Sequence, residues 1–277
     1  MGKKMMGIQK IVSNGVDELV AFSWDLCKNN THCSYPIYDS AIEMKVKFSG
    51  SELFGYYDES KLKGVLCFCT IPNDKYLQTI GFSVYDEKVA DEFLEYINEN
   101  FNSFSSYIGI TKENKIVSES LLKKGYHCID DSVMMKLNFV NYAVMNDSKV
   151  TRITLTNKES YLKFHNIHFE DGYWNTKRIS ENFDEWYIIS IIKRNAIVGA
   201  AFIKDYKNNK SEIFGIYAND EIVYTDLIRG LLNDYRLNKQ NIIEMICMVE
   251  CENVLLLNVM KQFGFSCNSS YCCYVNK

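Results

Sequence analysis

Apolar and polar positions change their period several times in the last third of the chain. An apolar run over residues 213–218 ends in a polar turn at 219–221. Apolar residues then recur at three- and four-residue spacing over 222–235, which is typical of a helix that buries one face. A second apolar run covers 242–248, and a shorter helical pattern follows over 253–265. This stretch therefore predicts strand, turn, helix, strand, turn and helix.

The first half of the chain shows the same order of elements. Landmark residues of the two halves lie 134 to 139 positions apart, and the pairs are Gly64 with Gly199, Gly81 with Gly215, Asn114 with Asn253, and Gly125 with Gly264. Four landmarks in one order favour a true duplication over generic elements that align by chance. Gly125 also follows a helical pattern, where a left-handed cap is common.

The length of the chain agrees with two domains of ordinary size. It has 277 residues, of which 47% are hydrophobic, enough for a core in each half. The strand pattern stops and polar residues gather over residues 138–149. We therefore predict an N-terminal domain over residues 1–140 and a C-terminal domain over residues 141–277.

Charge and hydropathy exclude several kinds of partner. The net charge is -4 and no Lys/Arg cluster has interleaved aromatic residues, so we expect no nucleic-acid partner. No stretch approaches 18 consecutive apolar residues, so we expect no membrane span. The basic start, residues 1–6, is not followed by the apolar stretch of a signal peptide. We therefore expect a cytoplasmic protein.

The cysteines and histidines do not have the spacing of a metal site. The chain has ten cysteines but no Cys-x-x-Cys, and in a reducing compartment these are expected to be free thiols. His165 and His168 lie near Glu170 and Asp171, with no third histidine close by. We expect no metal, and we favour a surface or capping role for the two histidines.

The stretch over residues 211–265 resembles the cofactor-binding half of the GNAT superfamily, the acetyl-CoA-dependent N-acetyltransferases. The last helix of that family typically starts at an Asn and ends in Gly-Phe, as do Asn253 and Gly264-Phe265 here. The resemblance covers nearly the whole chain in element order, and the second domain matches better. It implies an α+β, three-layer α/β fold of two tandem domains, each a mixed, mostly antiparallel sheet flanked by helices. It also implies acetyl-CoA as co-substrate and an amine of a small molecule or peptide as acceptor.

The resemblance assigns the cofactor to positions on the first strand and helix of this stretch. In the family the pantetheine arm lies between two splayed strands and bonds to backbone groups, here at Ile216, Tyr217 and Ala218. The pyrophosphate-binding motif [RQ]-x-x-G-x-[GA] falls on residues 223–228, which include Tyr224 and Thr225 and match it at no position. Asn253 completes the expected cofactor-binding set.

Acidic residues stand where the family binds phosphate. Asp226 lies there in the second domain, and Asp86-Glu87 lie there in the first. Helix capping is the favoured role for these carboxylates, because free N–H groups and the positive dipole end attract them. A carboxylate at that place also competes with a phosphate. We therefore expect pyrophosphate binding to be weak or absent, at least in the first domain.

Candidate catalytic residues are Glu212 and Tyr271. A general base belongs on or beside the strand before the cofactor turn, where Glu212 lies, although a glutamate at a strand start is equally an ordinary exposed residue. The general-acid tyrosine of the family falls on Met260, so that acid is missing from its usual place. Tyr271 on the last strand is the candidate substitute, although with 19 tyrosines a packing role is the commoner one.

Two functions remain open at this point. The first is N-acetyl or N-acyl transfer by the second domain, with the first domain as a degenerate scaffold. The second is a non-catalytic GNAT-like pseudoenzyme that binds a small molecule or a protein partner, which the poor motifs of both domains favour. The aromatic loop over residues 171–175 would form either a pocket wall or a plug between domains. Sheet edges would permit a homodimer.

Overall fold

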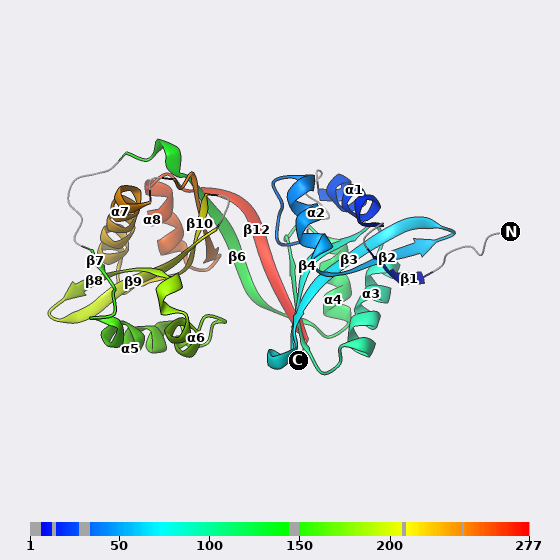
Figure 1. The fold of residues 1–277 in the computed structure, drawn as a ribbon, viewed down its shortest axis with the longest axis horizontal. Helices are drawn as coiled ribbons and strands as arrows, with labels where there is room; N and C mark the ends of the chain where they lie inside the picture. Colours follow the sequence, from blue (N-terminus) through cyan, green and yellow to red (C-terminus); the bar gives the residue numbers. More distant parts are fainter. Residues whose placement is uncertain are drawn as a thin grey trace. The chain divides into compact units, whose positions relative to one another are not determined.

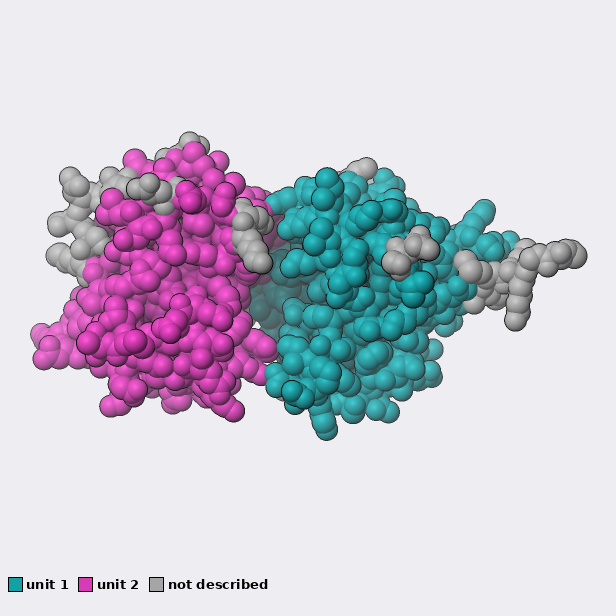
Figure 2. Space-filling model, viewed as in Figure 1, with its two compact units in different colours: residues 1–132, 270–277 teal, residues 133–269 magenta. Residues whose placement is uncertain are grey.

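A computed structural model describes residues 7–12, 15–27, 34–143, 150–206, 209–239 and 241–276. The chain forms two compact units (Figure 2). Unit 1 comprises Met1–Ser132 together with Ser270–Lys277, and unit 2 comprises Val133–Ser269. No described helix is long and apolar enough to cross a membrane.

Unit 1 is a sheet covered by two helices on each face (Figure 1). The strand order is β1-β2-β3-β4-β5-β12, and its elements are β1 (Gly7–Lys10), α1 (Val16–Cys27), α2 (Ala41–Ser49), β2 (Glu52–Asp58), β3 (Lys61–Ile71), β4 (Tyr76–Val84), α3 (Glu87–Asn100), β5 (Ser105–Ile110), α4 (Lys115–Lys123), the start of β6 (His127–Asn138) and the end of β12 (Ser266–Asn276). Neighbouring strand residues point to opposite faces. Leu53 therefore packs toward α1 and α2, whereas Phe54 packs toward α3 and α4.

Unit 2 repeats the three layers. The strand order is β6-β11-β10-β9-β8-β7, and its elements are the end of β6, β7 (Thr151–Arg152), α5 (Lys158–His168), α6 (Thr176–Glu181), β8 (Tyr187–Lys193), β9 (Ala196–Asp205), β10 (Lys210–Ala218), α7 (Glu221–Asn238), β11 (Glu244–Glu250), α8 (Val254–Gln262) and the start of β12. Helices α7 and α8 cover one face, and α5 and α6 cover the other (Figure 1). The predicted three-layer fold with a mixed, mostly antiparallel sheet is confirmed in both units.

The landmark residues of the repeat occupy equivalent places. Asn114 and Asn253 cap α4 and α8, each through its side-chain oxygen. Gly125 and Gly264 follow these helices with φ of 84° and 86°, a conformation that favours glycine. The structure thus agrees with the duplication that the spacing of these residues indicated.

The compact units do not follow the predicted division into residues 1–140 and 141–277. The chain passes from unit 1 to unit 2 within β6 and returns within β12. The reason is that residues 133–139 carry Met135 and Phe139 into the unit 2 core, whereas residues 272–276 pair with β5 in unit 1. The expected boundary stretch, 138–149, lies partly outside the described residues, at 144–149.

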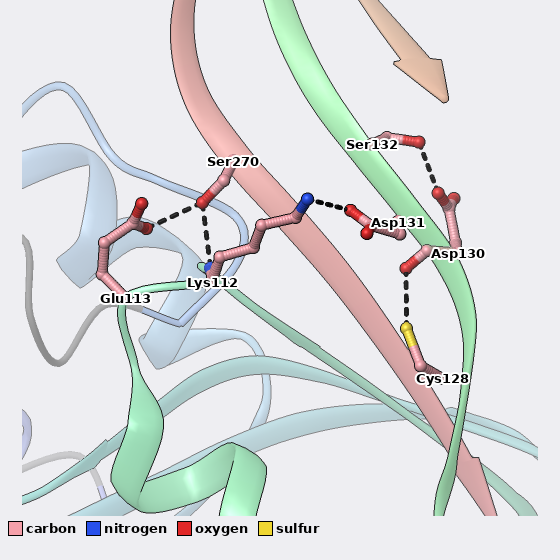
Figure 3. Close-up of polar contacts among 7 residues, drawn as sticks. All are labelled: Lys112, Glu113, Cys128, Asp130, Asp131, Ser132 and Ser270. Carbon is pink, nitrogen blue, oxygen red and sulfur yellow. Dashed lines mark hydrogen bonds and ion pairs between the residues drawn. The ribbon is translucent and has the colours of Figure 1, made fainter. Parts of the chain in front are cut away.

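Polar contacts fix the last strand in unit 1 (Figure 3). The backbone N–H of Lys112 donates to Ser270 Oγ at 2.9 Å, and this hydroxyl donates to the Glu113 carboxylate at 2.7 Å. The Lys112 ammonium also lies 2.5 Å from Asp131 on β6. Each of these groups belongs to unit 1, so the chain end is an integral part of that unit.

Candidate functional site

The parallel strands β10 and β11 of unit 2 separate part-way along their length. They pair from Lys210 with Glu244 as far as Ile213 with Cys247, and the pairing then stops. Strand β10 continues along β9 to Ala218. Alternate residues of an antiparallel pair turn their N–H and C=O groups away from the partner, so part of the β10 backbone past Ile213 faces the side that β11 has left. We call this strand separation the unit 2 wedge.

A β-bulge lies where the unit 2 wedge begins. The register between β9 and β10 shifts between Ile213 and Gly215, which leaves Phe214 as the extra residue. Phe214 and Gly215 both point toward α5 and α6, whereas Ile213 and Ile216 pack toward α7 and α8. A Cβ atom on Gly215 would lie 2.2 Å from the Phe202 ring, so this position requires glycine.

Glu212 lies directly before the wedge, on the face of β10 that α5 and α6 cover. Its carboxylate accepts a hydrogen bond from the Tyr206 hydroxyl. Burial raises the pKa of this carboxyl above its ordinary value, and the Tyr206 hydrogen bond offsets part of that rise. The residue opposite on β9 is Lys204, whose ammonium lies 2.7 Å from Glu185. A carboxylate with a raised pKa beside an open backbone edge is suited to accept a proton.

Aromatic side chains line the same face of unit 2. The ring centroids of Trp174 and Trp186 are 4.8 Å apart, and Phe214 lies 5.3 Å from Trp186. Tyr217, farther along β10, stacks on His168 at 3.8 Å. These rings form one aromatic layer along β10 within unit 2. The sequence predicted that the loop over residues 171–175, which carries Trp174, forms either a pocket wall or a plug between domains.

His165 holds the loop that carries Trp174. His165 Nε2 lies 2.7 Å from the Trp174 carbonyl oxygen, and Nδ1 lies 2.9 Å from the Tyr161 hydroxyl. Because a carbonyl can only accept, Nε2 carries the proton and donates it, and Nδ1 accepts from the Tyr161 hydroxyl. Burial lowers the pKa of His165, which favours this neutral ring. Both ring nitrogens are therefore engaged in hydrogen bonds. Among the described residues, no group of three His, Cys, Asp or Glu side chains could hold a metal ion.

The start of α7 differs from the phosphate-binding loop that the resemblance implied. Only Asn219 and Asp220 separate β10 from α7, and the Asp220 carboxylate accepts the N–H of Val223 at 2.8 Å. The predicted positions Tyr224 and Thr225 lie inside α7, where the Tyr224 N–H donates to the Asp220 carbonyl at 3.0 Å.

Residues 223–228, on which the resemblance placed the phosphate motif, therefore all belong to α7 and not to the turn before it. Asp226 is likewise within α7, and its carboxylate lies 3.2 Å from the guanidinium of Arg229. The capping role that we favoured for an acid at this helix start is taken by Asp220 in unit 2. In unit 1 the same role belongs to Asp86, which accepts the N–H of Val89 at 3.0 Å.

The structural comparisons agree with this architecture. A GCN5-related N-acetyltransferase from Sphaerobacter thermophilus superimposes with a TM-score of 0.65 at 12% identity, over 97% of this chain and 94% of that one. A tandem GNAT protein from the clavulanic acid biosynthesis pathway gives 0.57 at 10% identity, over 97% of each chain. This chain has the tandem GNAT fold. A GNAT-family acetyltransferase from Colwellia psychrerythraea gives 0.50 at 14% identity, over 98% and 99%. No protein-family model and no curated protein matches the sequence.

Asn253 and Tyr271, two other residues predicted from the GNAT resemblance, lie at the start of α8 and on β12. Asn253 caps α8 by accepting the N–H of Leu256 at 3.1 Å. Tyr271 belongs to unit 1, where its ring lies 4.5 Å from that of Tyr35. Burial raises the pKa of Tyr271, which keeps its hydroxyl protonated. The two predicted catalytic residues are therefore in different units, whereas Ile216, Tyr217 and Ala218 line the unit 2 wedge.

The first GNAT unit has an equivalent wedge, which its own chain fills. Strands β4 and β5 pair only as far as Gln78 with Tyr107. Beyond that point the N–H of Gly109 donates to Thr79 Oγ1 at 3.3 Å, and the Gly109 carbonyl accepts the N–H of Tyr35 at 2.9 Å. Ser34 adds a β-bridge to the end of β5. We call this separation the unit 1 wedge.

The β4 side of the unit 1 wedge is also covered. The Tyr38 hydroxyl donates to the Ile80 carbonyl at 2.6 Å, and the Phe48 ring would lie 2.5 Å from a Cβ atom on Gly81. Residues 81–84 of β4 are all buried, whereas residues 215–217 of β10 are half-buried. Tyr35 and Tyr38 lie in an irregular segment, and no periodic pattern in the sequence marks them as functional.

Proposed function

We propose that this protein is an N-acyltransferase whose active cleft is the unit 2 wedge. Acetyl-CoA is the proposed donor, and the amine of a small molecule or peptide is the acceptor. The observation that carries the proposal is the separation of β10 from β11 beyond Ile213, where residues 214–217 are half-buried, with Glu212 directly before it. The GNAT acetyltransferases of similar fold support acetyl transfer as the reaction.

The residues of the unit 2 wedge suit one part of the donor better than another. The backbone of Ile216, Tyr217 and Ala218 offers donors and acceptors to a pantetheine arm. The start of α7 suits a pyrophosphate poorly, because Asp220 occupies the N–H of Val223 and brings a negative charge. The donor is therefore held mainly by its pantetheine arm.

Glu212 performs the proton transfer in this proposal. When bound, the donor supplies an acetyl group on a thioester. The acceptor ammonium gives one proton to the Glu212 carboxylate, and the resulting amine forms the C–N bond as the C–S bond breaks. The nitrogen then loses a second proton to solvent and keeps the third as the amide N–H, the thiolate takes a proton from solvent, and Glu212 releases its proton to solvent. The raised pKa of Glu212 brings it closer to the pKa of an amine, which favours proton transfer.

A second candidate function is binding without catalysis. It is favoured by the two-residue turn at Asn219 and Asp220, which leaves no glycine loop for phosphates, and by the filled unit 1 wedge. A protein of this kind would use the unit 2 wedge to hold a small molecule or a peptide.

Thermal unfolding with acetyl-CoA, desulfo-CoA and ATP separates the two candidates. A ligand at 100 times its Kd stabilises by about 2.7 kcal/mol, a readily measured shift. We expect acetyl-CoA and desulfo-CoA to raise Tm and ATP to leave it unchanged. Transfer is then measured as release of the CoA thiol with a panel of amines.

Matched variants connect binding to chemistry. Glu212→Gln should keep the Tm shift and lose acetyl transfer. Gln78→Ala changes the equivalent position of unit 1 and should alter neither. The absence of any shift at millimolar acetyl-CoA would contradict the proposal and favour the second candidate.

A further inference from the structure

The buried indole N–H of Trp186 has no hydrogen-bond partner among the described residues. The residue is 5% exposed, and the indole nitrogen itself is buried. Buried donors are almost always paired, and one that is not calls for a physical explanation. Trp186 lies in the aromatic layer of unit 2, against Phe214 of the wedge strand. The unpaired donor is therefore next to the proposed active cleft.

The aromatic layer offers ring faces beside a carboxylate. Trp174, Phe214 and Tyr217 are half-buried, so part of each ring faces outward. Glu212 lies on the same face of β10, two positions before Phe214. When the amino group of a ligand reaches Glu212, the rest of that ligand would therefore lie against these aromatic rings.

The ammonium group of Lys204 lies over two of these rings. The Lys204 ammonium lies 5.3 Å from the ring centroids of both Trp174 and Trp186, held by the exposed carboxylate of Glu185. Electron-rich indole faces attract such a cation. The Lys204 side chain is one of the groups beside Trp186, and a long lysine chain can swing into solvent. Its displacement would uncover the indole faces of Trp174 and Trp186.

From these contacts we infer that the acceptor substrate is a primary amine on a flat aromatic body that carries a hydrogen-bond-accepting oxygen. This inference rests on the proposed function. The ring of the substrate stacks on Trp174, whose plane is nearly perpendicular to that of Phe214, its ammonium meets Glu212, and its oxygen accepts the Trp186 N–H. We expect polyamines and amino sugars to bind more weakly, because neither presents a flat ring that can stack on Trp174.

Tryptophan fluorescence of the full chain tests the binding step without any donor. Two of the three tryptophans lie in the aromatic layer, and Trp24 lies in unit 1. The probes are 4-methoxyphenethylamine, 4-ethylphenethylamine of nearly the same shape, spermidine and glucosamine. We expect a saturable change with the two aromatic amines, with the methoxy compound bound about tenfold more tightly. Saturable binding of spermidine or glucosamine with equal affinity would overturn the inference.

Three variants locate the binding. Trp24→Phe should retain the fluorescence change, and Trp174→Leu should weaken binding at least about tenfold. Trp186→Phe should remove the preference for the methoxy compound, and a preference that persists would contradict the role of its N–H. Calorimetric titration of Trp174→Leu answers the question if Trp186→Phe does not fold. Acetyl transfer to spermidine with no binding of aromatic amines would overturn this inference and leave the proposed function intact.

Discussion

The two wedges share one strand geometry and differ in what covers them. Each begins where a parallel pair of strands stops pairing, beyond Gln78 in unit 1 and beyond Ile213 in unit 2. In unit 1, Tyr35 and Tyr38 donate hydrogen bonds to backbone carbonyls of the separated strands. In unit 2, the corresponding strand is half-buried beside aromatic rings. A duplicated fold therefore provides two similar backbones, and local side chains decide which of them can receive a ligand.

The largest expected effect comes from Glu212→Gln. General-base catalysis typically contributes about 10²- to 10⁴-fold, so acetyl transfer should fall within that range. The matched change at Gln78 should leave the rate unchanged, since that side chain lies at the equivalent place in unit 1. Steady-state kinetics of thiol release measures both. An activity loss of less than about tenfold would show that Glu212 is not the base.

The pH dependence of stability gives an independent readout of Glu212. Its pKa is raised in the folded protein, so the folded state holds the proton more tightly than the unfolded chain. Charging this group therefore destabilises the fold above its folded pKa, and the penalty disappears as pH falls below its ordinary value of about 4.3. Glu212→Gln should be more stable than the parent at pH 7 and equal to it at pH 4. Denaturant unfolding at both values checks the sign.

The next effect is steric and compares the two wedge glycines. A Cβ atom would lie 2.2 Å from Phe202 at Gly215 and 2.5 Å from Phe48 at Gly81. Overpacking of this kind costs about 1–3 kcal/mol, so Gly215→Ala and Gly81→Ala should both lower Tm. Only Gly215→Ala should also reduce acetyl transfer, because it displaces the bulge of the unit 2 wedge. Gly50→Ala, at an open position, is the control that should change neither.

The order of elements and the helix caps could be predicted from the sequence because both are local. Asn253, Gly264 and the polar turn before α7 act within a few residues of their own helices. The family motif on residues 223–228 lies within α7, past the cap at Asp220, in agreement with the helical spacing over 222–235.

The contents of each wedge depend on contacts between distant segments. A period-2 pattern predicts a strand but not its partner, so the share of β12 in unit 1 could not be foreseen. Tyr271 was consequently assigned to the wrong half of the molecule. Tyr35 and Tyr38 lie in an irregular segment whose position follows from the strands that it meets.

A smaller effect tests the filling of the unit 1 wedge. Tyr38→Phe removes the hydroxyl that donates to the Ile80 carbonyl at 2.6 Å. An acceptor left without its partner costs about 1–3 kcal/mol when buried, so Tm should fall. Acetyl transfer should stay within twofold of the parent value, since the proposed cleft is in unit 2. Denaturant unfolding and kinetics on one preparation measure both quantities, and a parallel loss of activity would mean that unit 1 takes part in the reaction.

The smallest expected effect compares the two helix caps. Asp220→Gly frees the N–H of Val223 and removes a negative charge from the start of α7, whereas Asp86→Gly does the same for Val89 and α3. Glycine replaces an aspartate cap at a cost of a few tenths of a kcal/mol, so both variants should fold. A charge at a helix end contributes about 0.3–1 kcal/mol, which corresponds to a two- to fivefold gain in acetyl-CoA affinity for Asp220→Gly. Asp86→Gly should gain nothing, because Tyr35 and Tyr38 still fill its wedge. Titration of both variants with acetyl-CoA decides the comparison, and equal gains would show that the unit 1 wedge also admits the donor.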